Sequence, residues 1–406
     1  MPIAASTRPP PSAGKLAPGT ALLLLTVLLS LQPITNDVYL PALPTITDAL
    51  DSTIAGGQLT MGVLSVCFGL AQLVCGPLVD RYGRRPVLVA GLSLYTLASI
   101  ATALAPTMLW LVIWRGVQGA AMASAIVGAR AVVRDLYEPE FGARVLARAM
   151  TGLGAAAVAA PIIGGATVAL AGWRVTMALP GLFSACALAL VLWRFTETTP
   201  HRNRDATRLG PMFRTWWRIL QHPVFIKFTA LSVFTYSGLY AFLAGSSFVI
   251  VGQWGMSRPA FGLLLAMASA SYIGGTLLCR RMVPRMGVRR TVATAGWVTL
   301  AGGTVMGVLA LAGWHSPWAL VLPQCAYHFA HGMHQPCAQS GAVGPFPLAA
   351  GAASALTGFI MVLLAFPIGI FLGFALAEST LALPLVIWAC AIGTALSARL
   401  VARESR

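Results

Sequence analysis

Long apolar runs separated by short polar breaks dominate the chain. Most runs reach about 20 residues or more, the length that an α-helix needs to cross a hydrocarbon core of about 30 Å. Backbone groups inside a membrane must be satisfied within the chain, which favours helices, and no ten-residue alternation indicates a barrel. The pattern therefore predicts twelve membrane-spanning helices, over residues 17–44, 57–79, 86–105, 107–134, 142–171, 173–195, 223–252, 258–282, 288–312, 316–340, 349–376 and 379–402.

Basic residues occupy alternate breaks between these runs. Their groups lie at residues 81–85, 144–148, 194–218, 280–290 and 399–406. The intervening breaks hold only Arg174 and Arg258, together with several acids. Since cytoplasmic loops of membrane proteins carry an excess of Lys and Arg, the pattern predicts that both termini are cytoplasmic.

The longest polar stretch falls at the midpoint of the chain, and the two halves share a motif. Gly83 follows the second run in an Arg-rich turn, and Gly287 follows the eighth in a similar turn. Two halves with even numbers of spans imply a parallel repeat about an axis along the membrane normal. We expect an all-α integral membrane protein with two pseudo-symmetric six-helix bundles. Its parts are an N-terminal cytoplasmic tail, a first bundle, a cytoplasmic linker, a second bundle and a C-terminal tail, at 1–16, 17–195, 196–222, 223–402 and 403–406.

Composition excludes several classes of protein. Only 9% of residues are charged and 57% are hydrophobic, whereas soluble domains carry about 25% charged residues. The net charge of +16 comes from residues in short breaks, so we expect no nucleic-acid partner. The seven cysteines lie within apolar runs without CxxC spacing, so neither a disulfide framework nor a metal site is expected. No nucleophile–base pair or phosphate-binding loop indicates an enzyme, and no cofactor is expected.

The break after the second run carries a specific motif. The sequence from Gly76 to Pro86, GPLVDRYGRRP, resembles the signature of the major facilitator superfamily. Gly76 would let another helix approach closely, and Gly83 would permit a tight turn. The resemblance implies a charge-paired gate at the cytoplasmic side. The gate residues that we expect are Gly76, Asp80, Arg81, Gly83, Arg84, Arg130, Arg134 and Asp135.

The first run contains the acid that we expect to couple transport to the movement of protons. Residues 36–44, NDVYLPALP, resemble the first helix of Bcr/CflA-type drug exporters within that superfamily. Asp37 is the one acid that looks embedded, and a charge at such depth costs about 3 kcal/mol or more. A buried carboxyl can bind and release a proton, so Asp37 is the expected coupling site. The alternative is a residue in water at the outer end of the helix.

Arg115 is the one arginine inside a predicted span. It lies about 12 Å deep at 1.5 Å per residue and shares a helix face with Gln118. The sequence Arg-Val-Gln-Gly resembles the fourth-helix motif of the family, which implies that Arg115 modulates protonation of Asp37. The alternative is an arginine that bonds backbone carbonyls.

Further polar side chains could line a substrate cavity. The tenth run has histidines at three-residue spacing, within an arc of about 120°, for which proton relay, substrate contact, metal binding and structural bonding are all open. Two tyrosines of the seventh run share a face that suits aromatic cargo or core packing. The cavity residues that we expect are Asn36, Tyr39, Gln118, Tyr236, Tyr240, His328, His331 and Gln335.

The fifth run resembles the antiporter motif of the family in part. It keeps Pro161, Gly164 and Gly165, whose small size permits close helix packing, but alanines replace other expected glycines. Together these features predict a monomeric, multi-pass protein of the bacterial inner membrane. We expect efflux of small lipophilic drugs or metabolites in exchange for protons by alternating access. The alternative is a proton symporter or facilitator with the same fold.

Overall fold

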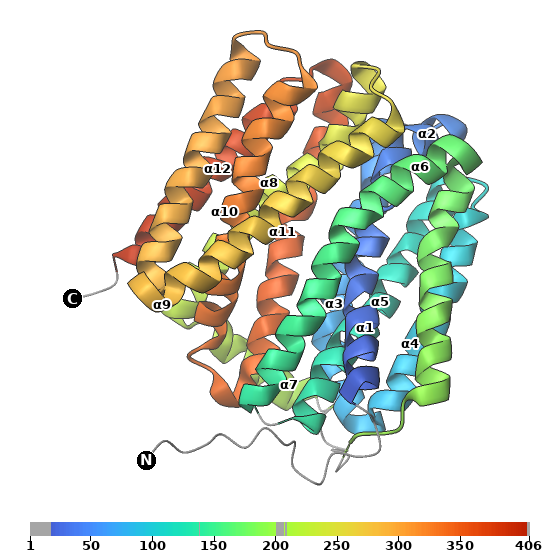
Figure 1. Cartoon of the computed structure of the whole chain (residues 1–406), viewed down its shortest axis with the longest axis vertical. Helices are drawn as coiled ribbons and strands as arrows, with labels where there is room; N and C mark the ends of the chain where they lie inside the picture. Colours follow the sequence, from blue (N-terminus) through green and yellow to red (C-terminus); the bar gives the residue numbers. More distant parts are fainter. Residues whose placement is uncertain (1–17, 138, 200–206, 208, 404–406) are drawn as a thin grey trace.

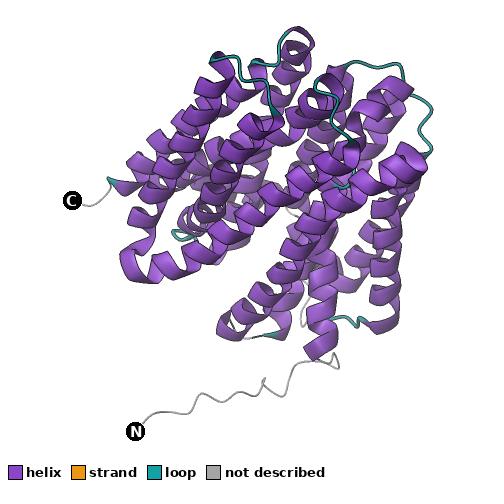
Figure 2. Cartoon of the chain, turned by 45° about the horizontal axis from the view of Figure 1, so that its top comes forward, coloured by secondary structure: helices purple, strands orange, loops and turns teal. Residues whose placement is uncertain are grey.

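The computed structural model describes residues 18–137, 139–199, 207 and 209–403. The predicted N-terminal tail and most of the C-terminal tail lie outside the described residues. The described part is built from helices, and Figure 2 shows no strand in it. The α-helices are α1 (Pro18–Asp37), α2 (Leu43–Ala49), α3 (Ile54–Tyr82), α4 (Arg84–Ala103), α5 (Met108–Leu136), α6 (Pro139–Arg194), α7 (Leu209–Leu220), α8 (Pro223–Ser247), α9 (Arg258–Leu311), α10 (Pro317–Val343), α11 (Ala350–Glu378) and α12 (Ala382–Ala402).

Short helical segments of other types connect some of these elements. Leu40–Ala42 (η1) and Pro347–Ala349 (η3) are 3-10 helices, and Phe248–Gln253 (η2) is a π-helix that continues α8. Such π-segments are rare and often occur at functional sites. The break after α1 and the π-helix after α8 stand at equivalent places in the two halves of the chain.

The helices have the length and apolar character of membrane spans. The described residues contain 9 helical segments that are long and apolar enough to cross a bilayer. Two of these segments, Arg144–Arg194 and Arg258–Leu311, are 51 and 54 residues long. Each contains one glycine with a left-handed backbone, Gly172 (φ 82°) and Gly287 (φ 77°), where the chain turns back on itself (Figure 1). The protein therefore crosses the membrane many times.

The helices form two groups that lie side by side. In Figure 1 the first half of the chain, coloured blue to green, lies on the right and the second half, yellow to red, on the left. Contacts within each half hold α1, α3, α4, α5 and α6 together and α8 to α12 together. The two groups meet along α3 with α11 and along α6 with α9. These two helix pairs therefore form most of the interface between the two groups.

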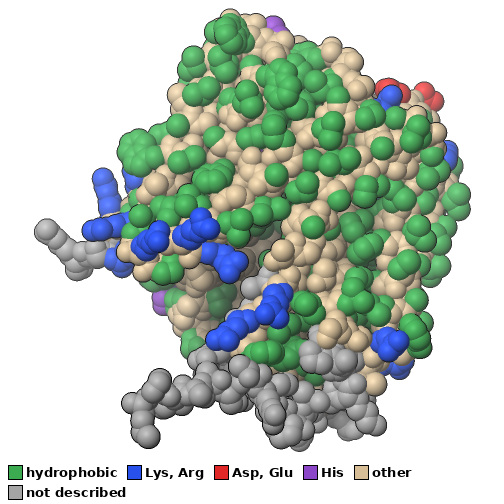
Figure 3. All heavy atoms as spheres, in the orientation of Figure 1, with side chains coloured by type: hydrophobic (Ala, Val, Ile, Leu, Met, Phe, Trp, Pro, Cys, Tyr) green, Lys and Arg blue, Asp and Glu red, His purple; other side chains and the backbone are tan. Residues whose placement is uncertain are grey.

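Charged side chains mark the two ends of the molecule differently. One end, which we call the basic end, carries the turn at Gly83, the turn at Gly287 and helix α7 (Figure 1). Arginine and lysine side chains gather toward this end in Figure 3, whereas the apolar surface between the ends is largely uncharged. The opposite end carries α2 and the turn at Gly172. This asymmetry is the one that the alternating arginine groups predict.

The stretch expected to be a linker contains a helix. Helix α7 lies at the basic end and packs on α11 and α8. Its Trp216 packs against the apolar cluster around Phe225, whereas Phe213 and Trp217 are 59% and 65% exposed. Because the surrounding sequence is polar, hydropathy alone did not indicate this helix.

Candidate functional site

The break at the end of α1 forms the centre of the site. Helix α1 ends at Asp37, and the chain continues through η1 into α2 within one apolar segment, Gly19–Ala49. Asp37 is therefore flanked by apolar sequence on both sides, and its side chain is partly buried. Ionisable groups at such depth are expensive and are associated with function.

Arg115 on α5 lies beside this break and is only 1% exposed. Its guanidinium carbon lies 4.1 Å from the ring centroid of Tyr39. Its Nη1 donates to Oε1 of Gln118 at 2.8 Å, and both terminal nitrogens donate to the carbonyl of Thr35 at 3.4 Å. The arginine is thus held by an aromatic face, an amide and a backbone carbonyl.

Asp37 and Arg115 do not form an ion pair in this structure. The three ion pairs of the described residues all lie at the basic end, far along the helices from Asp37. Arg115 bonds a backbone carbonyl, as the alternative supposed, and its expected influence on the protonation of Asp37 stays a prediction. The carboxylate of Asp37 is left without a counter-ion among the described residues.

The second half of the chain contributes two tyrosines to this centre. Tyr236 and Tyr240 on α8 have ring centroids 6.1 Å apart. Tyr240 and Tyr39 belong to one buried cluster, and Tyr236 packs against it. The break in α1 therefore faces α8 across the interface between the two groups of helices.

Several polar atoms at this centre have no hydrogen-bond partner among the described residues. They are Oδ1 of Asn36, the hydroxyls of Tyr39 and Tyr240, and both side-chain polar atoms of Gln58. Gln58 is 2% exposed, and both its Oε1 and the Tyr240 hydroxyl lie close to Gly369 on α11. Leaving buried polar atoms unsatisfied costs about 1–3 kcal/mol each, which favours a site that receives water or a ligand. The sequence analysis missed Gln58, although an amide inside an apolar run was the available signal.

The histidines of α10 are buried but face different neighbours. Nδ1 of His331 lies 3.1 Å from the hydroxyl of Thr235 on α8, and Nε2 of His334 lies 3.3 Å from the hydroxyl of Thr299 on α9. His328 bonds the backbone of its own helix. The three imidazoles therefore have separate hydrogen-bond partners, on α8, on α9 and on their own helix.

Helix α10 carries two further polar side chains, Gln335 and Cys337. Gln335 is partly buried, and its Oε1 has no protein partner. The thiols of Cys279 and Cys337 lie 3.6 Å apart between α9 and α10. Among the described residues, no three His, Cys, Asp or Glu side chains are grouped closely enough to hold a metal ion.

A charge cluster joins three helices at the basic end. Arg84 Nε lies 2.6 Å from Oδ2 of Asp135, and Arg84 Nη2 lies 3.2 Å from Oδ1 of Asp80. Arg134 pairs with the same Asp80 oxygen at 3.1 Å. Gly83, with φ 102°, makes the turn that brings Arg84 into position, as the motif implies. Arg84 and Asp135 are nearly buried, with side chains 5% and 6% exposed, whereas Asp80 is 40% exposed.

Glu197, just after α6, caps the first turn of α4. Its carboxylate accepts from the backbone N–H groups of Arg84 (2.9 Å) and Arg85 (3.1 Å), and from Thr199. Burial acts to raise the pKa of Glu197, but these hydrogen bonds outweigh it and hold the pKa below its usual value. The sequence analysis did not identify this residue, because its partners on α4 are more than a hundred residues away in sequence.

The remaining gate residues do not belong to the charge cluster. Arg81 donates to the hydroxyl of Thr207 and lies over the ring of Tyr82. A β-carbon at Gly76 would meet no atom within 4 Å. The expected close approach of another helix at Gly76 is therefore not present, and Gly76 instead lines a pocket with Arg130.

Helix α6 makes close contacts toward the opposite end. A β-carbon at Gly164 on α6 would overlap the carbonyl of Val38 in the α1 break, and one at Gly165 would lie 2.6 Å from the carbonyl of Arg258. A β-carbon at Gly262 on α9 would overlap the carbonyl of Pro161. The small residues of the partial antiporter motif thus allow α6 to pack directly on the backbones of α1 and α9.

These features, two groups of apolar helices with a polar centre between them, define a membrane transporter. A sequence profile described as Major Facilitator Superfamily matches residues 25–340, more than half of the chain. The chain belongs to the major facilitator superfamily, so it is a multi-pass transporter of small molecules and not an enzyme.

Known proteins place the chain more narrowly within that family. It is 28% identical to multidrug resistance protein D of Escherichia coli over 83% of this chain and 84% of that protein. It is 28% identical to a chloramphenicol resistance protein of Pseudomonas aeruginosa, over 82% and 79%, and 27% identical to a bicyclomycin resistance protein homologue of Haemophilus influenzae, over 71% and 73%. The predicted resemblance to Bcr/CflA-type exporters is confirmed.

A solved structure supports the fold. A bacterial homologue of the human lysosomal transporter Spinster, in an inward-facing and occupied conformation, matches with a TM-score of 0.69 at 15% identity. The match covers 95% of this chain and 97% of that one.

Proposed function

We propose that this protein exports small lipophilic molecules, including drugs, across the bacterial inner membrane in exchange for protons. The drug-resistance relatives support the class of cargo. The observation that carries proton coupling is Asp37, a partly buried carboxyl in the middle of an apolar segment and without a counter-ion among the described residues. The proton gradient supplies the energy, and no cofactor is required.

The proposed topology has twelve spans with both termini in the cytoplasm. Of the 9 candidate spans, the two long segments turn back at Gly172 and Gly287 and so cross twice, and α10 adds one more crossing. Excess positive charge marks the cytoplasmic side of membrane proteins, which assigns the basic end to the cytoplasm. The transporter is proposed to act as a monomer.

The chemistry at the centre follows from its unpartnered groups. With Asp37 deprotonated, a cargo molecule can bind between Tyr39 and Tyr236 and offer the carboxylate a positive or hydrogen-bonding group. Protonation of Asp37 weakens that interaction, so proton binding and cargo binding compete. Such competition couples the flux of cargo to the flux of protons, because the site carries either cargo or a proton across the membrane, but not both.

Alternating access requires that the two ends of the site close in turn. In this structure the glycines of α6 and α9 hold the two groups in close contact toward the opposite end, while a pocket lies between parts of α3 and α11 at the basic end. This arrangement corresponds to a site that opens toward the cytoplasm. Closure of the basic end would bring α11 toward Gly76, where a β-carbon now meets no atom.

The first experiment measures proton release from purified protein in weakly buffered detergent solution as lipophilic drugs are added. Wild-type protein should release protons on binding drug, and Asp37→Asn should not. Asp48→Asn is a matched control, since Asp48 is an exposed acid on the nearby helix α2.

Proton release that persists in Asp37→Asn would exclude Asp37 as the coupling site. Drug binding without proton release in wild-type protein would instead favour a facilitator. If Asp48→Asn loses proton release as Asp37→Asn does, the loss reflects general damage to the protein. Release in an Asp37→Glu variant would show that a carboxyl at this position is enough to restore it.

A further inference from the structure

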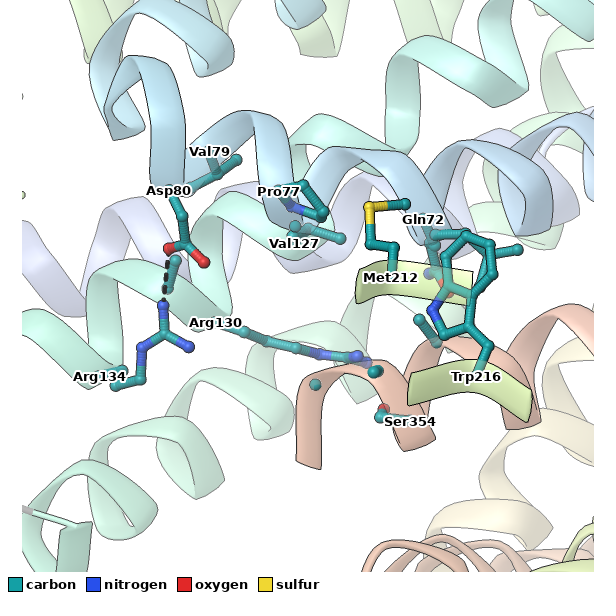
Figure 4. Close-up of a pocket in the computed structure, with 16 residues that line it drawn as sticks. Gln72, Pro77, Val79, Asp80, Val127, Arg130, Arg134, Met212, Trp216 and Ser354 are labelled. Carbon is teal, nitrogen blue, oxygen red and sulfur yellow. Dashed lines mark hydrogen bonds and ion pairs between the residues drawn. The ribbon is translucent and has the colours of Figure 1, made fainter. Parts of the chain in front are cut away.

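A cavity at the basic end is lined by residues other than those of the central site. It has a volume of about 320 Å³ and lies at the basic end between α3, α5, α7 and α11 (Figure 4). Cavities of this size accommodate small organic ligands. Both groups of helices line it, since Gln72 and Pro77 come from the first half and Ser354 from the second. The shape of the cavity therefore depends on how the two groups of helices sit at this end.

One positive charge in this pocket lacks a counter-ion. In Figure 4 the side chain of Arg130 extends from α5 across the pocket toward Ser354 on α11. Arg134, one turn further on, is paired with Asp80, but Arg130 has no ion pair within the described part of the chain. Since Asp80 is already shared by Arg84 and Arg134, the pocket carries an uncompensated positive charge.

The remaining lining is largely apolar. Helix α7 contributes Met212 and Trp216, and α3 contributes Leu73 and Pro77. Gln72 and Ser354 add polar groups near Arg130. A planar guanidinium binds carboxylate and phosphate groups in a two-point geometry. An apolar wall beside such a cation suits a ligand with an anionic head and an apolar body.

We propose that this pocket binds a small amphiphilic anion, with a carboxylate or phosphate head on Arg130 and an apolar chain against Trp216. The site is separate from the proposed cargo site, where the unpaired charge is negative. Because both helix groups line the pocket, a bound anion stabilises the conformation that is open at the basic end. The ligand thus slows the return of the transporter to its other conformation.

The experiment uses the full chain in detergent and a bromine-labelled decanoate as the probe, because bromine quenches tryptophan emission on contact. Wild-type protein should show saturable quenching. In Trp216→Phe the quenched fraction should be largely lost, whereas Trp217→Phe should retain it, since Trp217 is 65% exposed and does not line the pocket.

Charge variants examine the head-group contact. Arg130→Gln should weaken decanoate binding about tenfold or more, as expected for loss of a charged hydrogen bond. Arg130→Lys keeps the charge but loses the two-point geometry, so its affinity should lie between those of Arg130→Gln and wild type. Arg148→Gln, at an exposed basic residue outside the pocket, should bind normally. Equal affinity in Arg130→Gln and wild type, or equally tight binding of neutral bromodecanol, would overturn the proposal. If Arg130→Gln does not fold, the two tryptophan variants and bromodecanol still decide it.

The source of the anion is distinguished by a competition in lipid nanodiscs. If anionic phosphatidylglycerol nanodiscs abolish probe binding while neutral phosphatidylcholine nanodiscs retain it, membrane lipid supplies the head group. If binding persists in both, the ligand is a soluble amphiphile from the cytoplasm. Either result supports the anion site, whereas no binding in neutral nanodiscs would contradict it.

Discussion

Arg115 lies against the face of Tyr39, with its guanidinium carbon 4.1 Å from the ring centroid. A cation over an aromatic ring in a desolvated place contributes about 2 kcal/mol. We therefore expect Tyr39→Leu to lower the melting temperature in detergent and to alter drug-dependent proton release. Tyr39→Phe retains the ring and should behave nearly as wild type. An equal loss of stability in both variants would show that the hydroxyl, and not the ring, is the important group.

The contact of Gly164 with the carbonyl of Val38 leaves no room for a side chain. Gly164→Ala should cost about 1–3 kcal/mol through overpacking, measured as a lower melting temperature or as loss of monodisperse protein. Gly351→Ala is the matched control, because a β-carbon there meets no atom within 4 Å. Similar behaviour of the two variants would mean that α6 and the α1 break can separate without cost.

The two aspartates of the charge cluster should contribute unequally to the free energy of unfolding. Asp135→Asn leaves the nearly buried Arg84 without its closest partner, and breaking a buried pair costs about 3–5 kcal/mol. Asp80 is 40% exposed, so Asp80→Asn should cost about 1 kcal/mol or less. Thermal unfolding of the two variants in the same detergent compares them directly. A larger effect from Asp80→Asn would indicate that its role depends on another conformation.

The cap formed by Glu197 should make stability depend on pH. Because the pKa of Glu197 is lowered in the folded protein, its carboxylate stabilises the fold fully above the unfolded pKa of about 4.3 and loses that contribution as pH falls through the folded pKa. Glu197→Gln should therefore be less stable than wild type at pH 7, and this difference should shrink as the pH is lowered below about 4. Glu378→Gln, at an exposed acid of the opposite end, is the control. A difference that is constant with pH would mean that the charge of Glu197 does not matter.

Local patterns were enough to predict the membrane helices and the family. Apolar runs identify spans because lipid leaves no alternative to satisfied backbone, and the motif around Gly83 needs residues that are adjacent in sequence. The relation between Asp37 and Arg115 could not be derived in this way. That relation depends on the rotamer of the long arginine side chain. In this structure Arg115 instead donates hydrogen bonds to Gln118 and to the carbonyl of Thr35.

Residues that act across long sequence separations were also missed. Glu197 reaches the first turn of α4 over more than a hundred residues, and no pattern in the sequence marks that pairing. Gln58 becomes notable only when Tyr240 is placed beside the same glycine of α11. The histidines of α10 share a helix face by periodicity, but the sequence does not show that His331 and His334 bond to two different neighbouring helices.

The turns at Gly83 and Gly287 have nearly the same backbone, with φ and ψ of 102° and 164° in the first and 77° and 166° in the second. The second turn has Pro284 where the first has Asp80, and the ion pairs of the described residues all belong to the first. The two turns thus share a backbone shape but differ in their charges. Ionic strength should consequently act on the two halves unequally, because salt screens attractions only where opposite charges face each other.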